Sequence, residues 1–365
     1  MKKLLVLLFV VFALNANAQY VTNFAKNVNN KETDGFYYHL PRNVVKVDFV
    51  VERTQNVKGK YSSFAKELLN TDNYIKENKT TFAIKDVIVN TLTEADPDMV
   101  FFISTVADEK SKENINVNLA LNSDGIIQSF GVKPAKKDCE DEDRIELRAN
   151  IHPYIEPASD FYYIPLTEND DEEIESDSKL TDKEIAQSIV EEIKKLRVAY
   201  FDLITGYQEV NYGNTINYMI DRIKELENEY LAMFLGKTNS QVYTQTFYFT
   251  PEDVKNAITI AKFSENEGFN SKVGESIKIN FTDLAVSPYM NKLSKEDIEN
   301  VAHTNKMFYR NSAKVTMHIS LGENELSENR LIISQFGNVS LIPMNKMKLI
   351  FDVNSGQVMS ISNEE

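Results

Sequence analysis

Short runs in which apolar and polar residues alternate recur through this chain, and they constrain its fold more than any other feature. In the run VVKVDFVVE, residues 44–52, the side chains of Val45, Val47, Phe49 and Val51 fall on one face of an extended strand. Similar runs occur at 81–92, 99–107, 115–130, 241–249, 257–269, 276–281, 314–321, 330–342 and 347–362. A period of two with one strongly apolar face predicts antiparallel sheets that pack on a core.

The stretch 180–236, between these runs, has a helical period instead. Thr181 followed by Glu184 is typical of a capping box at the start of a helix. Apolar residues then recur three and four positions apart. The first stripe is Ile185, Ile189, Ile193, Leu196, Tyr200 and Leu203, continued by Ile204, and the second is Ile216, Met219, Ile220, Ile223, Leu226, Tyr230 and Phe234. Gly206 and Gly236 each follow a stripe, where a left-handed residue ends a helix. The pattern predicts two antiparallel helices joined by a short turn.

Together these patterns predict an α+β fold, in which two antiparallel, sandwich-like β-rich regions flank a long antiparallel helical hairpin. The expected parts are a signal peptide (1–18), an N-terminal β-rich domain (19–165), an acidic linker (166–179), a helical hairpin (180–236) and a C-terminal β-rich domain (237–365). The two β regions are also similar to each other in sequence. Residues 35–51 are similar to 307–321, and 119–130 are similar to 349–362. This similarity favours two related β domains.

The first 18 residues, MKKLLVLLFVVFALNANA, have the three parts of a secretory signal peptide. Lys2 and Lys3 form a basic start, an apolar run follows, and Ala16-Asn17-Ala18 is typical of a cleavage site. We therefore expect an exported protein, in the periplasm or associated with the outer membrane. No later run of apolar residues is long enough to span a bilayer, so no transmembrane segment is expected in the mature chain.

Charge and cysteine content narrow the function classes. The formal net charge of −15 disfavours nucleic acid as a partner, because a strongly acidic chain repels a phosphate backbone. The single cysteine, Cys139, cannot form an intramolecular disulfide, and its acidic neighbours disfavour a reactive thiolate. The four histidines lie far apart and show no metal-ligand spacing. We expect neither a metal site nor a cofactor.

Two acidic runs, DCEDED at 138–143 and ENDDEEIESD at 168–177, leave two interpretations open. Calcium prefers several carboxylate oxygens, so either run could bind it. Neither run has the ligand spacing of a calcium loop, and blocks of like charge are usually solvated. We favour a solvated linker.

Candidate binding residues fall in two aromatic clusters. Tyr207 and Tyr212 lie in the predicted turn LITGYQEVNYGN, residues 203–214, and could form a binding tip or only staple the helix ends. A second cluster, in PYIEPASDFYYIP at 153–165, could line an aromatic groove or cover an apolar sheet face; its residues are Tyr154, Phe161, Tyr162 and Tyr163. Beside the first helical stripe, Arg197 could anchor a ligand, but a paired structural arginine is the simpler expectation.

No catalytic residue can be assigned. The chain has no nucleophile elbow, zinc-protease motif, phosphate-binding loop or dinucleotide-binding glycine motif. A pair of carboxylates from distant positions would still suffice for glycoside hydrolysis.

Several stretches resemble the exported Bacteroidetes family catalogued as domain of unknown function 4831. These stretches are GFYYHLPRNVVKVDFVVE, EEIKKLRVAYFDLITGY, ENEYLAMFLGKTNSQVYTQTFYFTPE, FSENEGF and QFGNVSLIP, in the expected order over most of the mature chain. The resemblance implies a secreted or periplasmic location and supplies no catalytic residues. The favoured function is a non-enzymatic envelope protein that binds or scaffolds another envelope protein. The alternative is a periplasmic or secreted hydrolase that acts on glycan or peptide.

Overall fold

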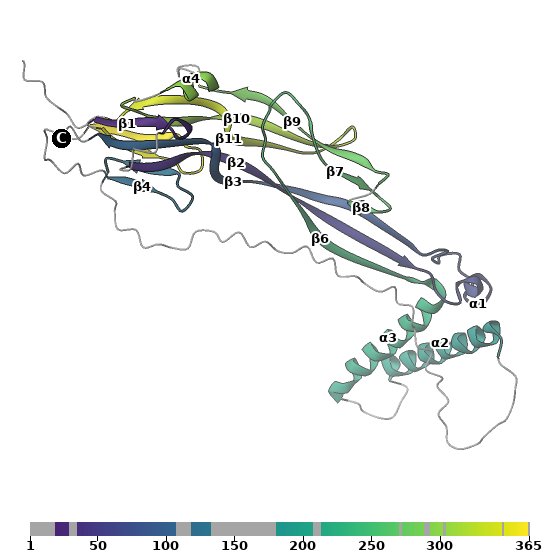
Figure 1. Cartoon of the computed structure of the whole chain (residues 1–365). Coiled ribbons are helices and arrows are strands. Elements are labelled where there is room, and N and C mark those ends of the chain that lie inside the picture. The colour runs from purple at the N-terminus through teal and green to yellow at the C-terminus, as the bar shows by residue number, and fades with distance from the viewer. Residues whose placement is uncertain are drawn as a thin grey trace, which may run out of the picture.

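The computed structural model describes residues 19–28, 35–106, 118–132, 180–206, 213–269, 272–287, 293–301, 304–344 and 347–363. Most of this part of the chain is β-structure (Figure 1). The strands are β1 (Gln19–Phe24), β2 (Gly35–Val57), β3 (Lys79–Val106), β4 (Leu119–Leu121), β5 (Ile127–Phe130), β6 (Lys237–Phe249), β7 (Ile258–Ser264), β8 (Gly268–Phe269), β9 (Glu275–Ala285), β10 (Lys306–Leu321), β11 (Asn324–Pro343), β12 (Met347–Phe351) and β13 (Val358–Asn363). The α-helices are α1 (Ala65–Leu69), α2 (Asp182–Thr205), α3 (Ile216–Leu235) and α4 (Lys295–Asn300).

The strands form three antiparallel sheets. Sheet A has the order β1-β3-β2-β6, sheet B the order β13-β12-β5-β4, and sheet C the order β11-β10-β9-β7-β8. The strands β2, β3, β10 and β11 are the longest of the described strands. Register shifts interrupt their pairing, at His39–Pro41 and Val50–Val51 in β2 and at Asn311–Ala313 in β10. Such bulges let one long strand bend and contribute to two cores in succession.

Sheets A and C pack face to face in the first core. The alternation predicted for residues 44–52 is confirmed: Val45, Val47, Phe49 and Val51 of β2 are all fully buried. Their partners on sheet C are Ile277, Ile279, Phe281, Val315, Met317, Ile319 and Ile333. Because the side chains of a strand alternate between its two faces, the intervening residues of these strands lie on the outer faces of the sandwich.

The second core lies at the opposite end of the long strands, where sheet B, β1 and α4 meet sheets A and C (Figure 1). Aromatic rings dominate its centre. The ring of Phe101 stacks on that of Phe308 with centroids 4.3 Å apart, and on that of Tyr38 at 5.4 Å. Apolar residues from all three sheets surround these rings, so this core joins the sheets into one β-structure, which we call the head.

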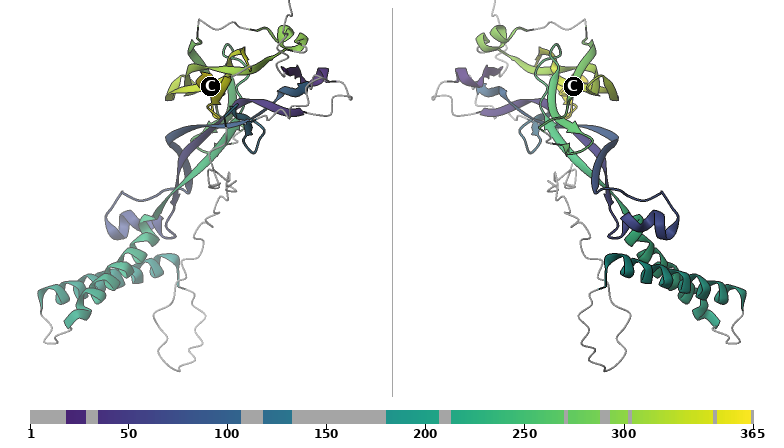
Figure 2. Two further views of the ribbon diagram at one scale, coloured as in Figure 1. Left: turned by 90° about the vertical axis from the view of Figure 1, so that its left-hand side faces the viewer. Right: turned by 90° about the vertical axis from the view of Figure 1, so that its right-hand side faces the viewer.

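Beyond the head, β2, β3 and β6 continue as a three-stranded arm, the stalk, which leads to α1, α2 and α3 (Figures 1 and 2). A third core lies there, made of Tyr61, Ala65, Ala186, Ile189, Val190, Ile193, Met233 and Phe234. The backbone N–H of Tyr61 donates to the carbonyl of Met233 at 2.8 Å. Gly59 is required at this junction, because a Cβ there would lie 2.5 Å from the same carbonyl oxygen.

The ends of α2 follow the predicted chemistry. Thr181 is the N-cap, its hydroxyl accepts from the N–H of Glu184, and the Glu184 carboxylate accepts in return from the N–H of Thr181. Gly206 is left-handed, with φ +69°, and its N–H donates to the carbonyl of Asp202. The other two α-helices, α1 and α4, are short.

The predicted fold class, an α+β protein with a long helical hairpin between two β-rich regions, is wrong. Of the described residues, 55% lie in strands and 24% in helices, and no long helical hairpin separates two β regions. Strands from before and after the helices pair directly: β6 lies beside β2 in sheet A, and β12 pairs with β5 in sheet B. A helical stripe shows which face of a helix is buried but not against what, and here the first half of α2 packs against Tyr61 and Ala65 at the end of the stalk.

The two β regions, which are similar in sequence, also have their strands in the same order. Each region supplies two long paired strands followed by a short hairpin, β2-β3-β4-β5 first and β10-β11-β12-β13 later. The two short hairpins join edge to edge through β5 and β12. The hydroxyl of Tyr38 in β2 accepts from the N–H of Phe308 in β10 at 3.0 Å, so the matching strands also touch. The same order of elements therefore appears twice, and the two short hairpins together form sheet B.

Several predictions lie outside the described residues: the signal peptide (1–18), Cys139, both acidic runs and the linker at 166–179. In the part of the chain that the structure describes, no helix has the length and apolar character needed to cross a bilayer.

Candidate functional site

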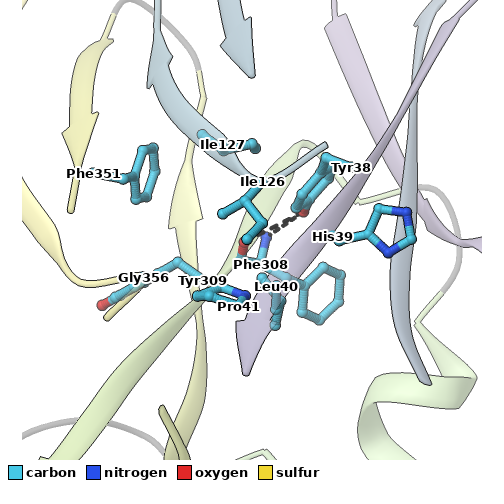
Figure 3. Close-up of a pocket in the computed structure, with 10 residues that line it drawn as sticks. All are labelled: Tyr38, His39, Leu40, Pro41, Ile126, Ile127, Phe308, Tyr309, Phe351 and Gly356. Atoms are coloured by element: carbon cyan, nitrogen blue, oxygen red, sulfur yellow. Dashed lines mark hydrogen bonds between the residues drawn. The ribbon is translucent and has the colours of Figure 1, made fainter. Parts of the chain in front are cut away.

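A small cavity opens where the second core meets the loop between β4 and β5 (Figure 3). Its lining residues are Tyr38, His39, Leu40, Pro41, Ile126, Ile127, Phe308, Tyr309, Phe351 and Gly356. The space that it offers to a water-sized molecule is about 10 Å³. Binding pockets for small molecules usually hold roughly 300–1,000 Å³. The cavity is therefore small for a substrate site.

The polar groups of this cavity are already bonded within the protein. The Tyr38 hydroxyl, drawn in Figure 3, contacts both the N–H and the carbonyl oxygen of Phe308, at 3.0 and 3.3 Å. Burial raises the pKa of Tyr38 far above its ordinary value, although the bond to the Phe308 backbone opposes this rise. The ring of His39 lies 3.3 Å from the carbonyl oxygen of Asp96. No carboxylate lines this cavity, so its chemistry does not support the hydrolase alternative.

Beside the cavity, a buried ion pair ties sheet A to sheet C. Arg310 of β10 and Asp96 of β3 are 5% and 8% exposed. The Arg310 guanidinium donates to Asp96 Oδ2 at 2.5 Å and to the carbonyl of Pro41, also at 2.5 Å. Burial lowers the pKa of Arg310, and the charge of Asp96 opposes that shift. The pair is bonded on both sides and holds the sheets together rather than facing a ligand.

A different kind of surface lies at the far end of α2, away from the head. Val198, Phe201 and Ile204 follow one another at intervals of three residues and are 60, 58 and 52% exposed. Residues three apart lie side by side on a helix. Tyr218, near the start of α3, is 73% exposed. Val198, Phe201 and Ile204 form what we call the tip surface, on the last turns of α2, in the helical part of the molecule that lies away from sheet B (Figures 1 and 2).

The helices that carry the tip surface are fixed by contacts on their other faces. Leu203 is buried, as the stripe predicts, but Ile204 is exposed, so its expected burial is wrong. A helical turn of 100° per residue places these neighbours on different sides. Arg197 of α2 donates to Glu227 of α3 at 2.6 Å, which confirms its expected role as a paired structural arginine. The Lys224 ammonium lies 5.3 Å from the Tyr200 ring centroid.

The charged residues around the tip surface are largely engaged with each other. Ion pairs three residues apart join Lys194 to Glu191, Lys195 to Glu192 and Arg222 to Glu225, at 2.7, 2.6 and 2.5 Å. Side chains paired along their own helix neutralise each other, so the apolar residues stand out from a nearly balanced surface. This arrangement favours contact with another apolar surface over contact with a charged ligand.

The structure does not describe the candidate binding residues named from the sequence. Tyr207 and Tyr212 lie in 207–212, between the ends of α2 and α3, outside the described residues. Tyr154, Phe161, Tyr162 and Tyr163 also lie outside them. The stripe expected from the sequence follows the buried side of α2 only, so it does not include Val198 and Phe201. The signal was present: apolar residues at 198, 201 and 204 lie off the stripe that ends at Leu203.

Comparison with known proteins gives one match. The family described as Domain of unknown function (DUF4831) matches residues 34–359. No curated protein and no solved structure matches. The match covers both β regions and the helices between them.

Proposed function

Because the chain belongs to the DUF4831 family, whose description assigns no activity, we propose a function from the structure: an exported envelope protein that docks another protein through its tip surface. In this proposal the β head and the stalk are the scaffold, and the protein performs no chemistry of its own. The observation that carries the proposal is the row of exposed apolar residues Val198, Phe201 and Ile204 on the last turns of α2. Contiguous exposed apolar residues are costly in water and commonly mark an interaction site.

The chemistry of the surface favours a protein partner. A net charge of −15 opposes attraction to anionic lipid or to nucleic acid. An apolar centre containing one large aromatic ring, with charged residues at its rim, is the usual composition of a protein interface. We therefore expect the partner to present an apolar patch that covers Phe201, with polar groups around it.

Photo-crosslinking in the native host tests this docking. A photoreactive phenylalanine analogue would replace Phe201 in the full-length chain, and Gln187, exposed elsewhere on α2, would carry the same analogue as control. We expect one discrete cross-linked protein from position 201 and none from 187. Equal cross-linking from both positions would contradict a specific surface.

A pull-down from envelope extract gives the matching loss-of-function test. Phe201→Ser should reduce recovery of that partner at least about tenfold, because central aromatic residues often contribute more than 1.4 kcal/mol to an interface. Val242→Ser changes an equally exposed apolar residue on β6 and should leave recovery unchanged. Tyr207→Ala with Tyr212→Ala should also weaken recovery if the neighbouring turn takes part. Unchanged recovery by Phe201→Ser would refute docking at this surface.

Export rests on residues 1–18 and needs its own test. These residues would be fused to a reporter enzyme that is active only outside the cytoplasm. Activity of the fusion, and its loss when Leu7 and Leu8 become Asp, would support export. Reporter activity that persists in this variant would contradict the signal-peptide assignment.

A further inference from the structure

One histidine and two glutamates meet on the hairpin that joins β10 to β11. His318 of β10 lies directly opposite Glu328 of β11, and a register shift between Ile319 and Ser320 brings Glu325 to the same place. Each of the three offers one ligand atom, and these atoms lie within 4.8 Å of one another. Because Met317 and Ile319 fill the core on either side, His318 must face outward, on the solvent side of sheet C.

We propose that His318, Glu325 and Glu328 bind a divalent transition-metal ion, with Zn²⁺ as the preferred ion. One imidazole nitrogen and two carboxylate oxygens form a ligand set that zinc accepts. Calcium and magnesium prefer oxygen ligands alone, so the imidazole selects against them. With a neutral imidazole, the three side chains carry two negative charges, which match a divalent ion. A fourth position remains for water or for a group from a partner.

Without the ion, a hydrogen bond joins two of the proposed ligands, His318 and Glu325. His318 Nδ1 and Glu325 Oε1 lie 2.6 Å apart, as one shared proton requires. Two ligands of tetrahedral zinc, each 2.0–2.1 Å from the ion, would lie about 3.3 Å apart. The pair must therefore open by about 0.7 Å. Glu325 can make this movement, because its side chain is more than half exposed.

The Thr282 hydroxyl can bond to the imidazole of His318 both without and with the metal ion. The hydroxyl of Thr282, in β9, lies 2.9 Å from His318 Nε2. A hydroxyl can donate or accept, so it can donate to Nε2 when Nδ1 carries the proton. When Nδ1 binds the ion, Nε2 carries the proton and donates to the same hydroxyl. Thr282 thus supports the metal-binding tautomer without any change of partner.

A carboxylate, that of Asp283, lies next to the Thr282 hydroxyl. Asp283 Oδ2 lies 3.4 Å from the Thr282 hydroxyl, which can donate to it once His318 donates to Thr282. Asp283 is left-handed, with φ +50°, at the bulge where β9 and β10 change register. Few non-glycine residues adopt this backbone, and such positions concentrate at functional sites. Proteins usually orient a ligating imidazole through a hydrogen bond from its second nitrogen, and here that bond goes to Thr282, which Asp283 contacts in turn.

Isothermal titration of ZnCl₂ into the purified mature chain tests the site. We expect one equivalent to bind to the natural chain and to Glu323→Gln, which removes a neighbouring carboxylate of the same hairpin outside the three ligands. His318→Asn and Glu328→Gln should each abolish that equivalent. Thr282→Val should weaken binding about 10–100-fold, whereas Thr282→Ser should retain it, because only the hydroxyl orients the imidazole. MgCl₂ should give no saturable heat.

Three outcomes would overturn the proposal. The natural chain could bind no stoichiometric zinc, His318→Asn could keep the equivalent, or Glu323→Gln could lose it as fully as Glu328→Gln does, which would indicate only diffuse attraction to acids. Thermal melting followed by circular dichroism would verify that each variant is folded. Glu328→Gln is isosteric and exposed, so this variant keeps the test decisive even if His318→Asn fails to fold.

Discussion

Replacing Asp96 with Leu is expected to destabilise the protein strongly. Asp96 is the carboxylate partner of Arg310, and both side chains are less than 10% exposed. In Asp96→Leu, the guanidinium keeps only the carbonyl of Pro41 as acceptor and remains buried with an uncompensated charge. Breaking a buried ion pair by removing one partner typically costs about 3–5 kcal/mol.

The double variant Asp96→Leu/Arg310→Met gives the decisive comparison. It removes both buried charges, so the uncompensated charge disappears. Its remaining cost is the Pro41 carbonyl, which loses a donor and should cost about 1–3 kcal/mol. From the midpoints of these two ranges, the double variant should therefore be more stable than Asp96→Leu alone by about 2 kcal/mol, although it carries one more substitution.

Urea unfolding of the four proteins in this cycle measures these differences. Far-ultraviolet circular dichroism is the suitable probe, because the chain contains no tryptophan. The interaction free energy is the double-variant cost less the two single costs. If Asp96→Leu costs less than about 1 kcal/mol, or if the single costs simply add, the ion pair does not tie sheet A to sheet C as argued.

Two further predictions concern backbone fit and pH. Gly337→Ala should abolish soluble, cooperatively folding protein, since a Cβ there would overlap the carbonyl oxygen of Asn311 across β10 and β11. Gly206→Ala, at a left-handed position with open space around it, should cost only about 1–2 kcal/mol. Equal effects of the two variants in urea unfolding would contradict this contrast. Backbone and side-chain hydrogen bonds from Thr181 lower the pKa of Glu184 below its ordinary range, so this cap stabilises α2 above that range and is lost as the pH falls through the lowered value. In a carboxyl-carbon NMR titration, Thr181→Val should raise the pKa of Glu184 part of the way to its ordinary range, because the hydroxyl is lost while the backbone N–H still donates. An unchanged titration would refute the contribution of the Thr181 side chain.

Local structure followed closely from the sequence, because short-range chemistry sets it. The alternation at Val45, Val47 and Phe49 predicted both a strand and its buried face. Thr181 and Glu184 predicted the start of α2, because the capping box needs only residues three apart. The positive φ of Gly125 and Gly206 likewise follows from turns that an L-residue side chain would strain.

Partners across long distances did not follow from the sequence. Nothing in the run QVYTQTFYF predicts that β6 pairs with β2 rather than with the strands that come after it, because alternation specifies a face and not a neighbour. The tip surface and the His318 cluster were missed for related reasons. Val198 and Phe201 are exposed because no element among the described residues covers that side of α2. His318 meets Glu325 because of a bulge in the β10–β11 pairing.

The pairing of β2 with β6 also limits the order in which the chain can fold. The strand β2 emerges early, yet one of its edges stays open until β6 arrives, after α2 and α3. An open strand edge readily pairs with another chain, and contacts between distant segments form slowly. A chain that crosses a membrane N-terminus first would therefore pass through an aggregation-prone stage in which β2 and β3 are extended and incomplete. Holding the chain unfolded until Phe249 has emerged would protect it during that stage.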